Sequence, residues 1–244
     1  MTVMKLLCCG KSRGMSFLTT LFVLLFNTAD SYAWHDRTHL GIAQAAGFER
    51  WYSAAAPDVA KSKDVFRAAE EKNHYYNNNA NRKVTAAMVM EQADRYNRPD
   101  DDEGHLYGAI IGSVRDYKAM AASGKYADYP LVFCAHYAGD LSMPLHNTAY
   151  DAFNKERHGV NDGVIECNVQ NNIGYIQRSI EGIRIENEQD LAREIARVAE
   201  TARRLGRKIR KENRNMTQAE TYTQVIRSAS LFRAILQYVG KNPC

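Results

Sequence analysis

The stretch from residue 191 to residue 211, LAREIARVAETARRLGRKIRK, carries the clearest fold signal in the chain. Its apolar side chains recur alternately four and three residues apart, at Leu191, Ile195, Val198, Ala202, Leu205 and Ile209. This spacing places them on one stripe of an α-helix and leaves most of the basic residues outside that stripe. The stretch therefore predicts a long amphipathic helix of unusual basicity.

Neighbouring segments have the same helical character. Thr217 and Glu220, three residues apart, form a capping-box pattern that predicts the start of a second C-terminal helix. We expect the turn between the two helices at 213–216 and expect the helices to pack together. Segments 106–122 and 131–141 are also helical by pattern, and no segment shows the sustained alternation typical of a strand. The sequence therefore predicts an all-α fold.

The composition is that of an ordinary globular protein. The chain has 244 residues, a hydrophobic content of 45% and only 5 Pro and 15 Gly, without repeats or low-complexity linkers, which indicates one domain. The formal charge of +4, from 32 Lys and Arg against 28 Asp and Glu, is close to balance. Any anionic partner would therefore meet a local patch. A mean hydropathy of -0.47 excludes a polytopic membrane protein.

The first 33 residues differ from the rest. Basic residues precede an apolar run at 17–26, and a short polar stretch then ends in Ser31-Tyr32-Ala33, with small residues at the third and first positions before the cut. This order is typical of a cleaved secretory signal at 1–33, since the run is about half of the roughly 20 residues that a membrane span needs. Cleavage would make Trp34 the new N-terminus of a domain at 34–244, and would place that domain outside the cell or in the periplasm.

The cysteines fit no metal or disulfide motif. Three would remain after cleavage, at Cys134, Cys167 and Cys244, without any C-x-x-C spacing. Neither a disulfide scaffold nor a cysteine zinc site is indicated, and at most one bridge can form. Cys134 lies in an apolar run and is expected to be a buried small side chain.

Histidine and aspartate occur twice as pairs four residues apart. His136 and Asp140 belong to the stretch HYAGDLSMPLH, and His158 and Asp162 repeat the spacing further on. On a helix such residues project from one face, so that an imidazole and a carboxylate can reach the same ion. Either pair alone is more often a hydrogen-bonded surface pair.

Further histidines strengthen the metal interpretation. Pro144 cannot continue a helix cheaply, so His146 is expected to leave the helix end in a new direction. His39 lies five residues after Trp34, and His74 lies in a His-Tyr segment. A cysteine-poor set of imidazoles and carboxylates suits catalytic zinc, which takes these ligands and keeps one position open for water.

The order of these motifs resembles the superfamily of secreted trinuclear-zinc phosphodiesterases, which comprises bacterial zinc-dependent phospholipase C and the fungal and plant single-strand-specific nucleases. The resemblance covers essentially all of 34–244 and is carried by the N-terminal Trp, the His five residues later, H-x3-D-x5-H and H-x3-D. It implies a compact multi-helix single domain that holds three zinc ions and hydrolyses phosphodiesters with a metal-activated water.

The resemblance also implies nine metal ligands. They are the amino group and carbonyl of Trp34 with His39 for one zinc, His74, His136 and Asp58 for a second, His146, His158 and Asp162 for a third, and Asp140 as the bridge between the first two. Asp64 is the rival to Asp58, which is also the candidate catalytic residue because it could orient or deprotonate the attacking water. His35 and His105 match no ligand and are expected to be surface or hydrogen-bonded histidines.

The outer contacts of the site are less specific. Asp36 and Glu166 are candidates to accept hydrogen bonds from ligand histidines. Four tyrosines could stack a base or cover a lipid: Tyr75, Tyr76, Tyr137 and Tyr150. The basic stretch from Arg203 to Lys211 could touch an anionic surface, although a solvated helix face is its ordinary interpretation.

The substrate expected from the sequence is a phospholipid. The short interval between His146 and His158 resembles the phospholipase branch, and the Gly-Gly-Asn element of the nuclease branch is absent. A zinc-dependent single-strand nuclease or 3'-nucleotidase is the alternative, and a non-enzymatic helical binding protein is a third possibility. No obligate protein partner is evident in the sequence.

Overall fold

The computed structural model describes residues 34–243, and over this range helices are the only regular secondary structure, which confirms the all-α prediction. The predicted signal at 1–33 and Cys244 lie outside the described residues. The α-helices are α1 (Asp36–Ala45), α2 (Ala56–Lys61), α3 (Asp64–Glu70), α4 (Ala86–Ala93), α5 (Leu106–Ala122), α6 (Asp128–Ser142), α7 (Ala152–Asp162), α8 (Ile173–Arg178), α9 (Glu188–Lys211) and α10 (Gln218–Tyr238). Short 3-10 helices are η1 (Trp51–Ser53), η2 (Glu71–Asn73), η3 (Pro144–Asn147) and η4 (Gln170–Asn172).

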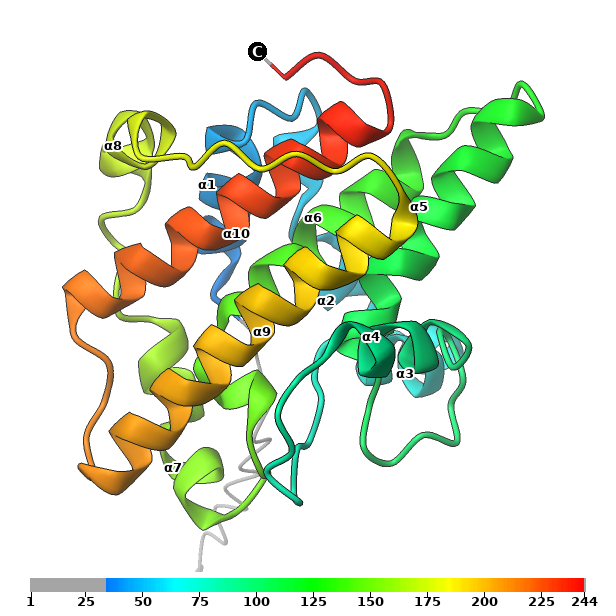
Figure 1. The fold of residues 1–244 in the computed structure, drawn as a ribbon. Helices are drawn as coiled ribbons and strands as arrows, with labels where there is room; N and C mark the ends of the chain where they lie inside the picture. Colours follow the sequence, from blue (N-terminus) through cyan, green and yellow to red (C-terminus); the bar gives the residue numbers. More distant parts are fainter. Residues whose placement is uncertain (1–33, 244) are drawn as a thin grey trace, which may run out of the picture. The chain divides into compact units, whose positions relative to one another are not determined.

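Helix α6 is the central element. Every residue from Pro130 to Ser142 is buried, and the helix contacts α1, α2, α5, α9 and α10 (Figure 1). A helix surrounded in this way has no polar outer face, so its polar side chains need partners inside the protein. His136 and Asp140 are therefore interior residues, held by the best-packed helix of the domain.

The C-terminal helices follow the predicted pattern closely. Five of the six stripe residues of α9 are buried, and Leu205 is half-buried. The capping box of α10 is present, because Thr217 Oγ1 accepts a hydrogen bond from Glu220 N at 3.2 Å and Glu220 Oε2 accepts one from Thr217 N at 3.0 Å. Figure 1 shows α9 and α10 running side by side, as expected, while α10 packs more extensively on α6.

The remaining sequence expectations concern membrane insertion and the cysteines. No helix within residues 34–243 is long and apolar enough to cross a bilayer.

Cys134 is free and buried, as predicted, and burial raises the pKa of its thiol to about 12 because it disfavours the thiolate. Cys167 is free and exposed.

Candidate metal centre

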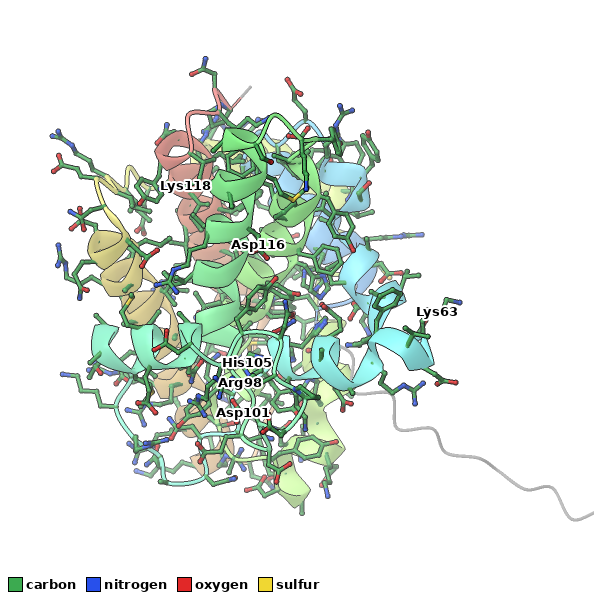
Figure 2. The ribbon with its side chains drawn as sticks, turned by 90° about the vertical axis from the view of Figure 1, so that its right-hand side faces the viewer. Lys63, Arg98, Asp101, His105, Asp116 and Lys118 are labelled. Carbon is green, nitrogen blue, oxygen red and sulfur yellow. The ribbon has the colours of Figure 1, made fainter. Side chains whose placement is uncertain are left out.

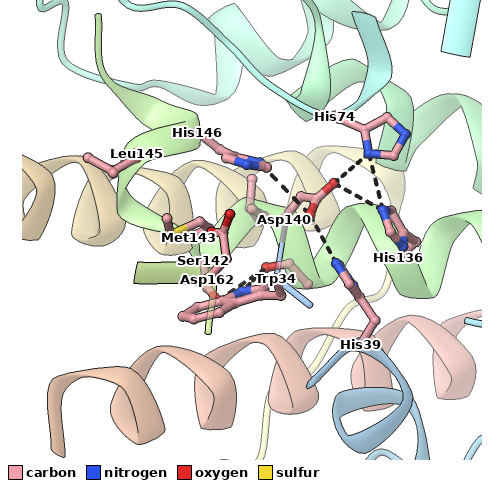
Figure 3. A network of polar contacts seen from close by, with 12 residues as sticks. Trp34, His39, His74, His136, Asp140, Ser142, Met143, Leu145, His146 and Asp162 are labelled. Carbon is pink, nitrogen blue, oxygen red and sulfur yellow. Dashed lines mark hydrogen bonds and ion pairs between the residues drawn. The ribbon is translucent and has the colours of Figure 1, made fainter. Parts of the chain in front are cut away.

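Asp140 lies at the middle of a buried cluster of four histidines (Figure 3). Its Oδ1 is 3.3 Å from His39 Nε2 and 3.8 Å from His146 Nδ1. Its Oδ2 is 3.1 Å from His74 Nδ1 and 3.4 Å from His136 Nε2. Each carboxylate oxygen therefore faces its own pair of imidazoles, as a carboxylate between two metal ions would.

Helix geometry brings the remaining candidates together. On α7, His158 Nε2 lies 3.4 Å from Asp162 Oδ2, so the second i, i+4 pair shares a face as the first pair does on α6. Helix α6 ends at Ser142, and η3 starts at Pro144 and carries His146 back toward the cluster. There His146 Nε2 lies 2.9 Å from His158 Nε2.

The described residues contain three buried groups that could hold a metal ion. They are His39, His136 and Asp140; Asp58, His74 and His136; and His146, His158 and Asp162. The last two groups are the trios that the family resemblance implies. Ligands about 2.0–2.1 Å from one tetrahedral zinc lie roughly 3.3 Å apart, which is close to the spacings of 2.9 to 3.4 Å given above for neighbouring ligand atoms.

Buried polar atoms without partners support the same conclusion. Neither oxygen of Asp162 has a hydrogen-bond partner within residues 34–243. Buried polar atoms are nearly always hydrogen-bonded, because an unpartnered one costs about 1–3 kcal/mol. Together with the imidazole and carboxylate donors, these atoms fit bound metal ions.

Two further candidates can be placed. Asp58 is buried in the second group, whereas its rival Asp64 is exposed at the start of α3 and belongs to none of the three groups. Trp34 is fully buried, and its Nε1 donates a hydrogen bond to Gly139 O at 2.9 Å. The indole of Trp34 therefore contacts the residue that precedes Asp140.

Burial and neighbouring charges shift the titration of the cluster. Burial lowers the pKa of His136 to about 3 and that of His146 to about 4, which favours the neutral imidazole that binds metal. Burial alone would raise the pKa of Asp140, but the nearby His136 and His146 hold it well below its usual range. Burial and the charge of Asp140 raise the pKa of Asp162 well above its usual range.

The rings of the ligand histidines have partners that the sequence analysis missed. His136 Nδ1 donates to Ala54 O at 2.9 Å, His158 Nδ1 donates to Asn154 Oδ1 at 2.8 Å, and His74 Nε2 donates to Glu70 Oε1 at 3.2 Å. Such contacts fix the ring orientation and the nitrogen offered to a metal. Glu70 and Asn154 each precede their histidine by four residues, a spacing that was visible in the sequence.

The prediction that Asp36 and Glu166 accept hydrogen bonds from the candidate ligand histidines was wrong. Asp36 is exposed in the first turn of α1. Glu166 instead accepts hydrogen bonds from Arg37 N at 2.9 Å and from Thr38 N at 3.0 Å, so it caps the start of α1. The helix needs this partner because its own cap position, His35, makes no side-chain capping bond.

A small cavity of ≈ 80 Å³ adjoins the cluster. It is lined by Glu71, Tyr75, Asn77, Leu145, Tyr150 and His158. Of the four tyrosines considered above, Tyr76 and Tyr137 are buried in the core and do not line it. Tyr75 and Tyr150 are thus the two of these tyrosines that line the cavity.

A larger apolar groove of ≈ 740 Å³ lies between α2, α3, α5 and α6. Its lining includes Val59, Phe66 and Tyr129, which are largely exposed, and it reaches Glu70 beside the cluster. Val65 on α3 is 87% exposed. This groove is the main apolar feature near the metal-binding groups.

Part of the basic stretch of α9 is paired with carboxylates. Arg203 and Arg204 both bind Glu200, and Arg210 lies 2.5 Å from Asp151. Arg203 is moreover buried. The stretch thus presents less free positive charge than its sequence suggests.

Comparisons with known proteins add no relative. No protein-family model matches the chain, and no curated protein matches it. The resemblance described above therefore depends on the motif residues and on the cluster that they form.

Proposed function

We propose that the chain is a zinc-dependent phosphoric diester hydrolase of phospholipase C type, which cleaves the glycerol–phosphate ester of phospholipids with water. The observation that carries this proposal is Asp140, whose two oxygens each face separate imidazoles within a cluster of three potential metal groups. Zinc bound there would activate water at neutral pH and offset negative charge on the phosphate oxygens.

The residues of the chain have distinct parts in this proposal. Asp140 would join two of the metal sites, while His146, His158 and Asp162 would hold the metal nearest the small cavity that His158 lines. Trp34 would contribute its amino group and carbonyl beside His39 once the preceding residues are removed. No side-chain nucleophile is required, because water attacks the phosphorus.

Asp58 serves as a metal ligand and orients the attacking water. Burial alone would raise its pKa, but His136 and Lys61, whose Nζ is 2.7 Å from Asp58 Oδ1, hold that pKa below the usual range. A carboxylate that stays ionised is a good ligand and hydrogen-bond acceptor. It is a weak proton acceptor at neutral pH, where a base with a pKa near 7 would work better.

The apolar groove favours a lipid substrate over a nucleic acid. Helices α2 and α3 supply Asp58 and Glu70 to the cluster and its surroundings, and α3 also presents Val65 and Phe66 to solvent. An apolar face of this kind is suited to acyl chains or to a bilayer interface. The carboxylate partners of Arg203, Arg204 and Arg210 reduce the attraction of the basic stretch on α9 for a polyanion.

The alternative is a single-strand nuclease or 3'-nucleotidase. Tyr75 and Tyr150 flank the cavity beside His158, and an aromatic face there could stack a base. An assay series with phosphatidylcholine, single-stranded DNA and a nucleotide monoester distinguishes the two functions. Preferred turnover of DNA would establish the nuclease, and bound metal without any turnover would indicate a binding protein.

The matched pair Asp58→Asn and Asp64→Asn tests the site. Both changes remove one carboxylate charge, but only Asp58 lies in a metal group. We expect about three zinc ions in the wild type and in Asp64→Asn, and a loss of metal and of roughly 100-fold or more in turnover in Asp58→Asn. Elemental analysis and the phosphatidylcholine assay measure both effects, and equal behaviour of the two variants would refute the assignment.

A further inference from the structure

Glu70 is a buried carboxylate that lies outside the three metal groups yet contacts one of them. It ends α3, and its Oε1 accepts a hydrogen bond from His74 Nε2 at 3.2 Å and from the Tyr137 hydroxyl at 2.7 Å. Asn73 Nδ2 lies 3.3 Å from the other oxygen. A buried carboxylate with several donors directed at it is held in one orientation.

This contact decides which nitrogen His74 presents to the cluster. Nδ1 of His74 lies 3.1 Å from Asp140 Oδ2 and 3.1 Å from His136 Nε2, so this atom faces the metal groups. An ionised carboxylate only accepts hydrogen bonds, so the Nε2 atom facing Glu70 carries a ring proton. Nδ1 faces the Asp140 carboxylate, and a metal ion held by these two groups would take the Nδ1 lone pair and leave the ring proton on Nε2.

A buried network holds Glu70 in place from behind. Tyr137 follows His136 directly on α6, and Asn73 Nδ2 also lies 3.2 Å from the Tyr137 hydroxyl. Asn73 Oδ1 in turn lies 3.0 Å from His105 Nε2, and His105 Nδ1 lies 2.9 Å from Asp101 Oδ2. Figure 2 shows His105 and Asp101 close together beside the start of α5.

We infer that Glu70 is a positioning residue of the metal centre, which holds the proton on His74 Nε2 and so directs His74 Nδ1 at the metal. Tyr137 and Asn73 orient Glu70, and His105, which matches no ligand, anchors Asn73. This inference rests on the proposed metal centre. It adds residues that neither the His-Asp spacing nor the three metal groups include.

The first test is the zinc affinity of Glu70→Ala, measured by competition with a chromophoric chelator. Losing such a partner typically weakens metal binding 10–100-fold, and we expect a loss of about that size. Glu70→Gln keeps an oxygen acceptor for His74 and should lose less. Glu91→Ala, an exposed glutamate on α4, is the matched control and should bind zinc as the wild type does.

A spectroscopic readout separates positioning from a general structural role. In zinc-loaded protein labelled with ¹⁵N-histidine, the wild type should show His74 with its proton on Nε2 and protected from exchange with water. Glu70→Gln should retain the proton with faster exchange. A His74 protonated on Nδ1 in the wild type would overturn the inference, even if Glu70→Ala does not fold.

The two proposals can fail separately. If the wild type binds zinc and folded Glu70→Ala binds it equally well, the role of Glu70 is refuted and the metal centre stands. If the wild type binds no zinc, the metal centre itself is refuted and the inference falls with it.

Discussion

At the scale of single residues, the geometry of the site depends on Gly139, which has no side chain beyond hydrogen. A Cβ atom at Gly139 would lie 2.6 Å from His39 Nδ1 and 2.9 Å from His39 Cε1. The His39 ring has little room to move, because it stacks on His136 with 3.7 Å between ring centroids and faces Asp140. Gly139 therefore permits the close approach of α1 to α6.

Gly139→Ala is expected to displace His39 and to weaken the metal group formed by His39, His136 and Asp140. We predict a lower zinc content by elemental analysis, with helical circular dichroism close to that of the wild type. Gly182→Ala is the control, since a Cβ there meets no atom within 4 Å. An unchanged zinc content in Gly139→Ala would show that His39 is not a ligand.

The sequence predicts the candidate metal ligands better than the residues that support them. Spacing alone identified the two His-Asp pairs, because residues four apart share a helix face whatever the rest of the fold does. Glu70 and Asn154 also lie four residues from their histidines, so a signal existed. Neither of them, however, belongs to a pair of the His-x3-Asp type. The Ala54 carbonyl that accepts from His136 is a backbone atom 82 residues away, which no local pattern indicates.

At the scale of helices, packing depends on a second close approach. A Cβ at Gly108 on α5 would lie 2.1 Å from the backbone carbon of Gln92 on α4. Backbone atoms cannot rotate away, so the two helices would have to separate. Gly159, on the exposed face of α7, has no atom within 4 Å of its Cβ position.

Alanine at these two helical positions should therefore have opposite effects. Gly108→Ala should lower the free energy of unfolding by about 1–3 kcal/mol through overpacking. Gly159→Ala should leave it unchanged or raise it by up to about 1 kcal/mol, because alanine has the higher helix propensity. Urea denaturation of both variants measures the difference, and equal midpoints would contradict the close contact between α4 and α5.

Long helices were predictable where short ones were not. The pattern at 106–122 coincides with α5, and the pattern at 131–141 misses only the ends of α6. Helices α2 and α8 have six residues each, too few for an apolar period of 3.6 to repeat. Tertiary contacts stabilise such helices, and a single sequence does not reveal those contacts.

At the scale of the whole molecule, Glu200 connects the C-terminal helices to the first half of the chain. On α9 it accepts hydrogen bonds from Arg203 and Arg204, and it also accepts one from Val84 N at 3.0 Å, 116 residues away. These contacts, led by that of Arg203, lower the pKa of Glu200 to about 2 from an ordinary 4.5. Its folded pKa thus lies below its unfolded value.

This shift gives a stability contribution with a defined pH range. For a carboxyl group with a lowered folded pKa, the stabilisation is complete above the unfolded pKa and is lost as the pH falls through the folded pKa. Glu200→Gln should lower the free energy of unfolding by about 1–2 kcal/mol at neutral pH. The difference from the wild type should shrink between pH 4.5 and about 2.

Unfolding by urea at several pH values, with a chelator present so that metal loss does not contribute, measures this difference. Glu194→Gln, which removes another Glu–Arg pair from α9, is the control. Its partner Arg197 is well exposed, so we expect a change below about 0.5 kcal/mol at every pH. A penalty for Glu200→Gln that stays constant down to the lowest pH would mean that the Glu200 charge does not contribute to the free energy of unfolding.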